Sequence, residues 1–173
     1  MTSTNTKTSS AKARHKFLYR SNATKFKNVM KITEKLIFAA DANENERLLL
    51  NQAFEETKLP FKIEFTKNGE ELLKGLENYY AENQAFPKMI LLDLNIPKPF
   101  SGLEILKSIK AHFLYKTIPI LILSSERSDA NIIEAYSLGA NSFIVKPASF
   151  KEFQNFVKTL NNYWFEMAAL PTT

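Results

Sequence analysis

A carboxylate that follows a short apolar run is the first candidate for chemistry in this chain. Residues 89–92 are apolar, and Asp93 ends the run before the Pro-containing segment 94–97. In a parallel α/β sheet, ligands bind just outside the carboxyl ends of the strands, so an Asp at this point is a candidate nucleophile or metal ligand. A lone Asp more often starts a turn or caps a helix. The case for chemistry therefore depends on the residues that accompany Asp93.

Three other apolar segments end in polar groups in the same way. These groups are Asp41 after residues 36–40, Ser124 and Ser125 after residues 118–123, and Lys146 after residues 142–145. A pair of carboxylates, a hydroxyl and an ammonium would therefore converge at one edge of a sheet. Carboxylates hold a hard cation such as Mg²⁺, whereas hydroxyl and ammonium groups hold phosphate oxygens. Four such groups at consecutive strand ends are strong evidence of a functional site.

This set of residues resembles the receiver domain of two-component response regulators, over about residues 34–165. The resemblance implies that Asp93 accepts a phosphoryl group from a histidine kinase. It also implies that Mg²⁺ is bound by Asp93, by the backbone carbonyl of Asn95 and, through water, by Asp41. Such a transfer depends mostly on positioning and charge neutralisation. The protein would catalyse at most its own phosphorylation and dephosphorylation, and is otherwise not expected to be an enzyme.

Three further residues match the family at its phosphate and switch positions. Lys146 would neutralise the phosphate, and its bond to Pro147 resembles a cis peptide of the family that aims the ammonium inward. Ser124 would donate to the new phosphate, and Phe143 would turn inward behind it. In the purely structural alternative, Ser124 caps a helix and Phe143 stays packed in the core.

One position departs from the family pattern. The family's acidic pair aligns with Asp41 and Ala42, so the acid that is usually the direct Mg²⁺ ligand is missing. Loss of even an outer-shell group typically costs about 10–100-fold in metal affinity. Asn43 or Glu44 could lend an oxygen in its place. The alternative function is therefore a phosphorylation-independent pseudo-receiver, an interaction module with a degraded magnesium site.

The elements that must position these residues alternate strand and helix five times from residue 35. Strands are predicted at 35–40, 61–65, 88–93, 118–123 and 142–146, and helices at 44–57, 69–81, 102–113, 127–138 and 149–166. The uniformly apolar fourth strand is typical of a strand covered on both faces, whereas the second alternates like an edge strand. This pattern predicts a flavodoxin-like α/β fold with five parallel strands in the order 2-1-3-4-5 and helices on both faces.

Composition excludes several classes of site and of protein. The chain has 173 residues, enough for one domain with a sizeable core, and contains no cysteine. Disulfides, zinc–thiolate sites and thiol catalysis are thus excluded. Two histidines are too few for a histidine metal cluster. No apolar run is as long as a membrane helix requires, and no secretory signal is evident. A cytoplasmic protein without a membrane partner is expected.

The net charge of +5 originates in the N-terminal segment. Residues 1–35 carry nine Lys or Arg and one acid, whereas the rest of the chain carries 14 Lys or Arg and 17 acids. We expect a basic disordered tail over residues 1–33, a receiver domain over 34–166 and a C-terminal extension over 167–173. A basic tail can attract nucleic acid. A solvated arm is the more common outcome, so nucleic-acid binding is not expected.

The end of the chain predicts a protein contact. Four large apolar residues are too dense to be all buried in one small domain: Tyr163, Trp164, Phe165 and Met167. Exposed aromatic and Met side chains suggest an interface. The ending is similar to that of stand-alone receivers such as the bacterial phytochrome response regulators. We therefore expect a single-domain response regulator that signals by protein contact. Its expected partners are a sensor histidine kinase of phytochrome type and a second copy, the latter through the face of the fourth helix, fifth strand and fifth helix.

Overall fold

Five parallel strands form the centre of the structure, a computed structural model that describes residues 35–171. The strands are β1 (Lys35–Ala40), β2 (Phe61–Thr66), β3 (Met89–Asp93), β4 (Ile120–Ser124) and β5 (Ser142–Val145). They pair in the order β2-β1-β3-β4-β5, which confirms the predicted flavodoxin-like topology. The predicted tail, residues 1–33, lies outside the described residues.

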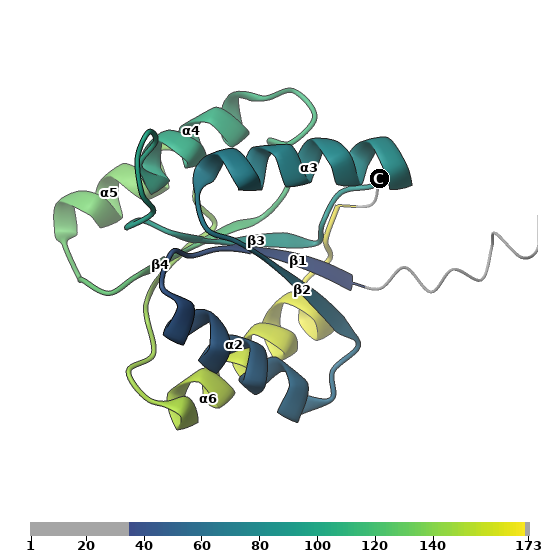
Figure 1. The fold of residues 1–173 in the computed structure, drawn as a ribbon, viewed down its shortest axis with the longest axis vertical. Coiled ribbons are helices and arrows are strands. Elements are labelled where there is room, and N and C mark those ends of the chain that lie inside the picture. The colour runs from purple at the N-terminus through teal and green to yellow at the C-terminus, as the bar shows by residue number, and fades with distance from the viewer. Residues whose placement is uncertain (1–34, 172–173) are drawn as a thin grey trace, which may run out of the picture. The chain divides into compact units, whose positions relative to one another are not determined.

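Helices cover both faces of this sheet. They are α2 (Glu44–Thr57), α3 (Gly69–Asn83), α4 (Gly102–Ala111), α5 (Asp129–Ser137) and α6 (Phe150–Leu160). Helices α3, α4 and α5 lie on one face, and α2 and α6 lie on the other (Figure 1). Successive side chains of a strand point to opposite faces, so Phe38 and Ile90 belong to the first core and Ile37 and Leu91 to the second. No helix in the described range 35–171 has the length and apolar character to span a bilayer.

The helix boundaries differ from the predicted ones where a polar side chain decides them. The helix predicted over residues 127–138 corresponds to α5. Its N-cap is Ser128, whose hydroxyl accepts the N–H of Asn131 at 3.5 Å. A cap residue has non-helical backbone angles, so the helix begins only at Asp129. At the other edge of the sheet, the exposure of β2 alternates along the strand, as predicted for an edge strand.

The last helix changes form at residue 161. A single helix was predicted over 149–166, but α6 ends at Leu160 and continues as a π-helix, η1 (Asn161–Met167). Trp164 and Phe165 are half-buried and both pack against the core between α2, α6 and the sheet. A π-helix closes i→i+5 hydrogen bonds, and in η1 both of these adjacent aromatics contact the same core. Met167 stays 78% exposed.

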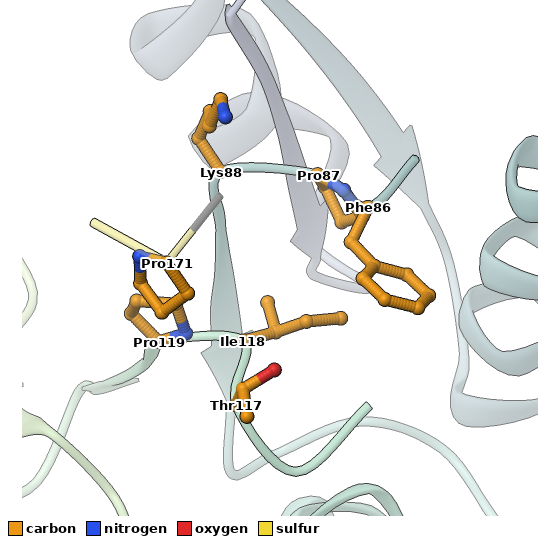
Figure 2. A pocket seen from close by; sticks show the side chains of 7 residues that line it. All are labelled: Phe86, Pro87, Lys88, Thr117, Ile118, Pro119 and Pro171. Atoms are coloured by element: carbon orange, nitrogen blue, oxygen red, sulfur yellow. The ribbon is translucent and has the colours of Figure 1, made fainter. Parts of the chain in front are cut away.

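Beyond η1 the chain reaches the amino ends of β3 and β4. Pro171 lies beside Pro119, at a small hollow that Phe86, Pro87 and Ile118 also line (Figure 2). Because all strands are parallel, this is the end of the sheet opposite the one where β3 carries Asp93. The last described residues thus pack at the end of the sheet opposite Asp93.

A half-buried lysine joins the loops at that same end. The Lys110 ammonium, at the end of α4, donates to the carbonyl oxygens of Lys116 and Ile118 at 3.2 and 2.8 Å and to Asn141 Oδ1 at 3.1 Å. Asn141 Oδ1 also accepts the N–H of Ile120, at 3.0 Å. Burial lowers the pKa of Lys110. One side chain therefore connects the end of α4 to the starts of β4 and β5.

Candidate functional site

The carboxyl ends of β1 and β3 carry the two acids predicted for the site. Asp41 directly follows β1 and Asp93 ends β3, and the two residues are 8% and 3% exposed. Each Oδ1 accepts a backbone N–H two residues further on, from Asn43 at 2.7 Å and from Asn95 at 2.9 Å. These local bonds hold one oxygen of each carboxylate and leave Oδ2 to face the rest of the site.

Lys146 places its ammonium between these two carboxylates. Its Nζ lies 2.8 Å from Asp41 Oδ2 and 2.8 Å from Asp93 Oδ2, and it also bonds to Glu46. Burial by itself lowers the pKa of Lys146, but the hydrogen bonds with the three carboxylates outweigh it and raise the pKa overall. Lys146 is therefore a permanent cation at the centre of the site.

The peptide bond after Lys146 differs from the expectation. The family resemblance implied a cis bond between Lys146 and Pro147, but in the described part of the chain the cis peptide is Lys98–Pro99, in the loop between β3 and α4. The expectation for Lys146–Pro147 is therefore wrong. The backbone of Lys146 instead continues the pairing of β5 with β4, because its N–H donates to the carbonyl of Ser124 at 2.8 Å.

Glu46 is a third carboxylate of the site that sequence reasoning did not identify. It lies in the first turn of α2, where its Oε1 accepts from Asn43 Nδ2 at 3.0 Å and its Oε2 contacts Lys146. Asn43 or Glu44 had been expected to lend an oxygen, but Glu44 is exposed and Glu46 reaches the site. Residue spacing gave no signal for this, because Ala42 precedes α2 and does not share a helical face with Glu46.

Two adjacent serines at the end of β4 make different hydrogen bonds. The Ser124 hydroxyl donates to the carbonyl of Glu126 at 2.9 Å and accepts the N–H of the same residue at 3.2 Å. Ser125 lines the cleft beside Asp93, and its hydroxyl accepts from Asn95 Nδ2 at 3.1 Å. In this conformation, the hydroxyl that faces the cleft belongs to Ser125, and Ser124 is bonded within its own loop.

Phe143, the predicted switch aromatic, lies in a different hollow. It is half-buried against the core, and its N–H donates to the hydroxyl of Tyr136 at 3.3 Å. The hollow is also lined by Arg127, Ile132 and Val145. Phe143 therefore belongs to the face of α5 and β5 rather than to the cleft at Asp93.

The start of α4 closes in on the strand end that carries Asp93. A Cβ at Gly102 would lie 2.4 Å from the carbonyl oxygen of Asp93 and 2.6 Å from Leu94 Cα. Only glycine permits this approach. Ser101 and Glu104 form a reciprocal capping box that holds the helix start in place. The loop after Asp93 thus ends in a close contact between the start of α4 and the end of β3.

The open cleft at this edge has the donor chemistry of a hard cation. It is lined by Ala42, Glu46, Asp93, Asn95 and Lys146, with Asn43 and Ser125. Carboxylate and carbonyl oxygens are the ligands that Mg²⁺ takes. Within residues 35–171, no three acidic or histidine side chains already surround a common metal position, because the carboxylates hold the Lys146 ammonium. The residue types in the cleft fit such a cation. A cation that binds here has to share the carboxylates with the Lys146 ammonium.

Comparison with known proteins gives consistent matches. The model of the response regulator receiver domain matches residues 37–158. The probable methanogenesis regulatory protein FilR2 of Methanothrix harundinacea is 32% identical over 129 residues, which cover 75% of this chain and 83% of that protein. Response regulator Rcp1 of Synechocystis sp. is 26% identical over 138 residues, which cover 79% of this chain and 93% of that protein.

Two solved structures are similar along nearly their whole length. The phosphorylated cyanobacterial phytochrome response regulator RcpA has a TM-score of 0.73 and 32% identity, over 80% of this chain and 99% of that one. The Mn²⁺-bound form of Rcp1 has a TM-score of 0.69 and 25% identity, over the same shares. The range matched by the family model, residues 37–158, contains Asp41, Asp93 and Lys146.

Proposed function

Because the chain belongs to the response regulator receiver family of two-component signalling, we propose that it accepts a phosphoryl group from a histidine kinase on Asp93. One observation carries the proposal. The Asp93 carboxylate is 3% exposed at the end of β3, lines an open cleft and lies 2.8 Å from a lysine ammonium. A carboxylate in this position is accessible on one side and paired with a cation on the other.

The proposed step is a nucleophilic displacement at phosphorus. An oxygen of Asp93 attacks the phosphorus of a phosphohistidine, the P–O bond forms as the P–N bond breaks, and the leaving imidazole takes a proton from water. The negative charge of the carboxylate is replaced by that of the phosphoryl oxygens, close to Lys146. Because such transfers depend on positioning and charge neutralisation, the fixed ammonium is the main contribution of the protein.

A divalent cation belongs to the same proposal. Asp93, the Asn95 carbonyl and, through water, Asp41 are the residues proposed to hold Mg²⁺, which supplies further neutralisation of phosphoryl oxygens when bound. Support comes from the oxygen donors that line the cleft and from the similar Rcp1 structure, which is Mn²⁺-bound. Ala42 provides no side-chain oxygen, so the affinity is expected to be low.

Ser124 and Phe143 are the proposed switch. To donate to a phosphoryl group on Asp93, the Ser124 hydroxyl has to leave the carbonyl of Glu126 that it now contacts. A hydrogen bond to a charged group contributes about 1.5–3 kcal/mol, whereas a shift from 1:99 to 99:1 requires about 5.5 kcal/mol. Ser124 and Lys146 therefore have to act together, and Phe143 is proposed to follow their movement.

The proposed output is protein contact through the face of α5, β5 and α6, the fourth helix, fifth strand and fifth helix of the receiver. Ile133, Tyr136 and Val145 are 67%, 50% and 49% exposed on this face. Exposed apolar side chains of this kind mark interaction sites. Similarity to phytochrome response regulators supports a phytochrome-type kinase as the partner. A second copy of the chain is the further proposed partner, and the proposed location of the protein is cytoplasmic.

The test is intact mass after incubation with acetyl phosphate and Mg²⁺. The wild-type chain should gain one phosphoryl group, and Asp93→Asn should gain none. Asp129→Asn, which removes an exposed Asp at the start of α5, should label like the wild type. An adduct of equal yield on Asp93→Asn contradicts the proposal. A folded wild type that gains no adduct favours the pseudo-receiver.

A further inference from the structure

We infer that Glu46 supplies the carboxylate that Ala42 lacks and is itself a ligand of the divalent cation at this site. The inference rests on the proposed function, because that cation serves the transfer to Asp93. Nothing in the receiver pattern of the sequence assigns a role to Glu46. Three independent features of the described residues support it: the position of the side chain in the cleft, its release from helix capping, and the charge balance around it.

The first feature is position. Ala42 and Glu46 both line the cleft that contains Asp93 and Asn95. Ala42 precedes α2 and Glu46 is the third residue of the helix, and the Glu46 side chain reaches the same cleft, where it contacts Lys146. With Asp41 and Asp93, Glu46 restores the number of carboxylates that the site would have with an acid at position 42.

The second feature is that Glu46 is not used to cap its own helix. Three other helices have a glutamate at the equivalent third position, and each accepts a backbone N–H from the chain before the helix. The pairs are Glu71 with Lys67 at 2.8 Å, Glu104 with Ser101 at 2.7 Å, and Glu152 with Ala148 at 2.8 Å. In α2, the N–H of Asn43 donates to Asp41 instead, at 2.7 Å. Glu46 makes side-chain contacts in place of that backbone bond: its Oε1 accepts from Asn43 Nδ2 at 3.0 Å, and its Oε2 contacts Lys146 in the cleft.

The third feature is charge. Asp41, Glu46 and Asp93 share the single ammonium of Lys146. Arg47 lies nearby, but its Nη1 donates to the backbone carbonyl of Asp41 at 2.7 Å and not to a carboxylate. Partly buried carboxylates in excess of their counter-charges favour the binding of a cation. A divalent ion with oxygen ligands meets that requirement.

Glu46 is also the carboxylate that can exchange partners most readily. Its side chain is 27% exposed, whereas those of Asp41 and Asp93 are 11% and 4% exposed. Glu46 can therefore leave Lys146 and bind a cation that enters from the cleft, while the ammonium keeps its ion pairs with Asp41 and Asp93.

The experiment measures metal binding and not phosphorylation. Mn²⁺ binding to the full chain is followed by electron paramagnetic resonance of the free ion, and Mg²⁺ binding by calorimetry. Glu46→Gln should weaken both by at least about 10-fold. Glu44→Gln removes the same charge from an exposed position on the same turn and should leave the affinity unchanged. Adding Ala42→Asp to Glu46→Gln should restore binding.

Equal loss in Glu46→Gln and Glu44→Gln means that only the general charge of the helix matters, which overturns the inference. Wild-type affinity in Glu46→Gln, or no binding by the folded wild type, overturns it as well. Thermal melts of each variant confirm that it is folded. A wild type that binds Mn²⁺ through Glu46 but takes no phosphoryl group contradicts the proposed function and supports the metal ligand.

Discussion

Lys146 Nζ lies 2.8 Å from Asp93 Oδ2, so a side chain from the end of β5 reaches the end of β3 across the intervening strand β4. The two residues are 53 positions apart in the chain. Only the order of the strands brings them together, because parallel strands with their carboxyl ends aligned present all their terminal residues at one edge. The chemistry of this site is thus a direct product of the sheet topology.

Removal of the Lys146 charge should destabilise the fold. Lys146→Met leaves three carboxylates without their common partner, and breaking a buried ion pair from one side costs about 3–5 kcal/mol. Urea unfolding at pH 7, followed by the fluorescence of the half-buried Trp164, measures this loss. Lys151→Met removes the same charge from an exposed position and serves as the control. Equal loss in both variants would show that the ion cluster is not stabilising.

The contribution of Lys146 to stability should disappear only at high pH. Its pKa is raised in the folded state, so the protonated form stabilises the fold. That contribution is fully present below the unfolded-state pKa of about 10.4 and is lost as the pH rises through the higher folded-state pKa. The difference in unfolding free energy between wild type and Lys146→Met should stay constant from neutral pH to about pH 10. A decline that begins near neutral pH would contradict the upward shift.

A methyl group at position 102 should disturb the loop of Asp93. Gly102→Ala places a Cβ 2.4 Å from the Asp93 carbonyl oxygen, so the helix or the strand end has to move, at a cost of about 1–3 kcal/mol. Phosphoryl uptake from acetyl phosphate should fall with it. Ser108→Ala, on the exposed side of the same helix, should change stability by less than about 0.5 kcal/mol. Unchanged stability and uptake in Gly102→Ala would be contrary evidence.

Two large apolar residues of η1, Phe165 and Met167, should differ in their contribution to stability. The Phe165 ring centroid lies 4.3 Å from that of Phe61, and the Lys35 ammonium lies 5.3 Å from both. Phe165→Ala should therefore cost about 2 kcal/mol, less than the roughly 3–5 kcal/mol of a fully buried Phe. Met167→Ala should leave the melting temperature unchanged, because Met167 is 78% exposed.

Self-association can be measured on the same two variants, Phe165→Ala and Met167→Ala. If η1 contributes to a protein contact, Met167→Ala should weaken self-association in sedimentation experiments without any loss of stability. The expectation from sequence had placed Trp164 and Phe165 in that contact, but both pack against the core. A Phe165→Ala variant that melts like the wild type and dissociates would return them to the interface.

The fold could be predicted from sequence because the strands are short apolar or, in β2, alternating segments, and each helix repeats at a helical period. Boundaries were less accurate, since they depend on single polar contacts. The capping hydroxyl of Ser128 delays the start of α5 to Asp129. The π-helix was not predictable from apolar periodicity, because that pattern does not show how Trp164 and Phe165 pack against the core.

The site could be predicted only where residues follow strands. Asp41, Asp93 and Lys146 converge as expected, since their positions depend on the sheet alone. Glu46 was missed because the direction of its side chain depends on which carboxylate accepts the N–H of Asn43. In the folded chain that acceptor is Asp41. That outcome is a property of the folded chain and not of residue spacing.

The Lys110 contacts have a mechanical consequence. By fastening α4 to the starts of β4 and β5, this ammonium gives both strands a fixed base at the end remote from Asp93. Phe143 lies two residues past Asn141 and therefore near this base, whereas Ser124 lies at the far end of β4. Of the two proposed switch residues, the serine is thus the one that stands farther from the point where its strand is held.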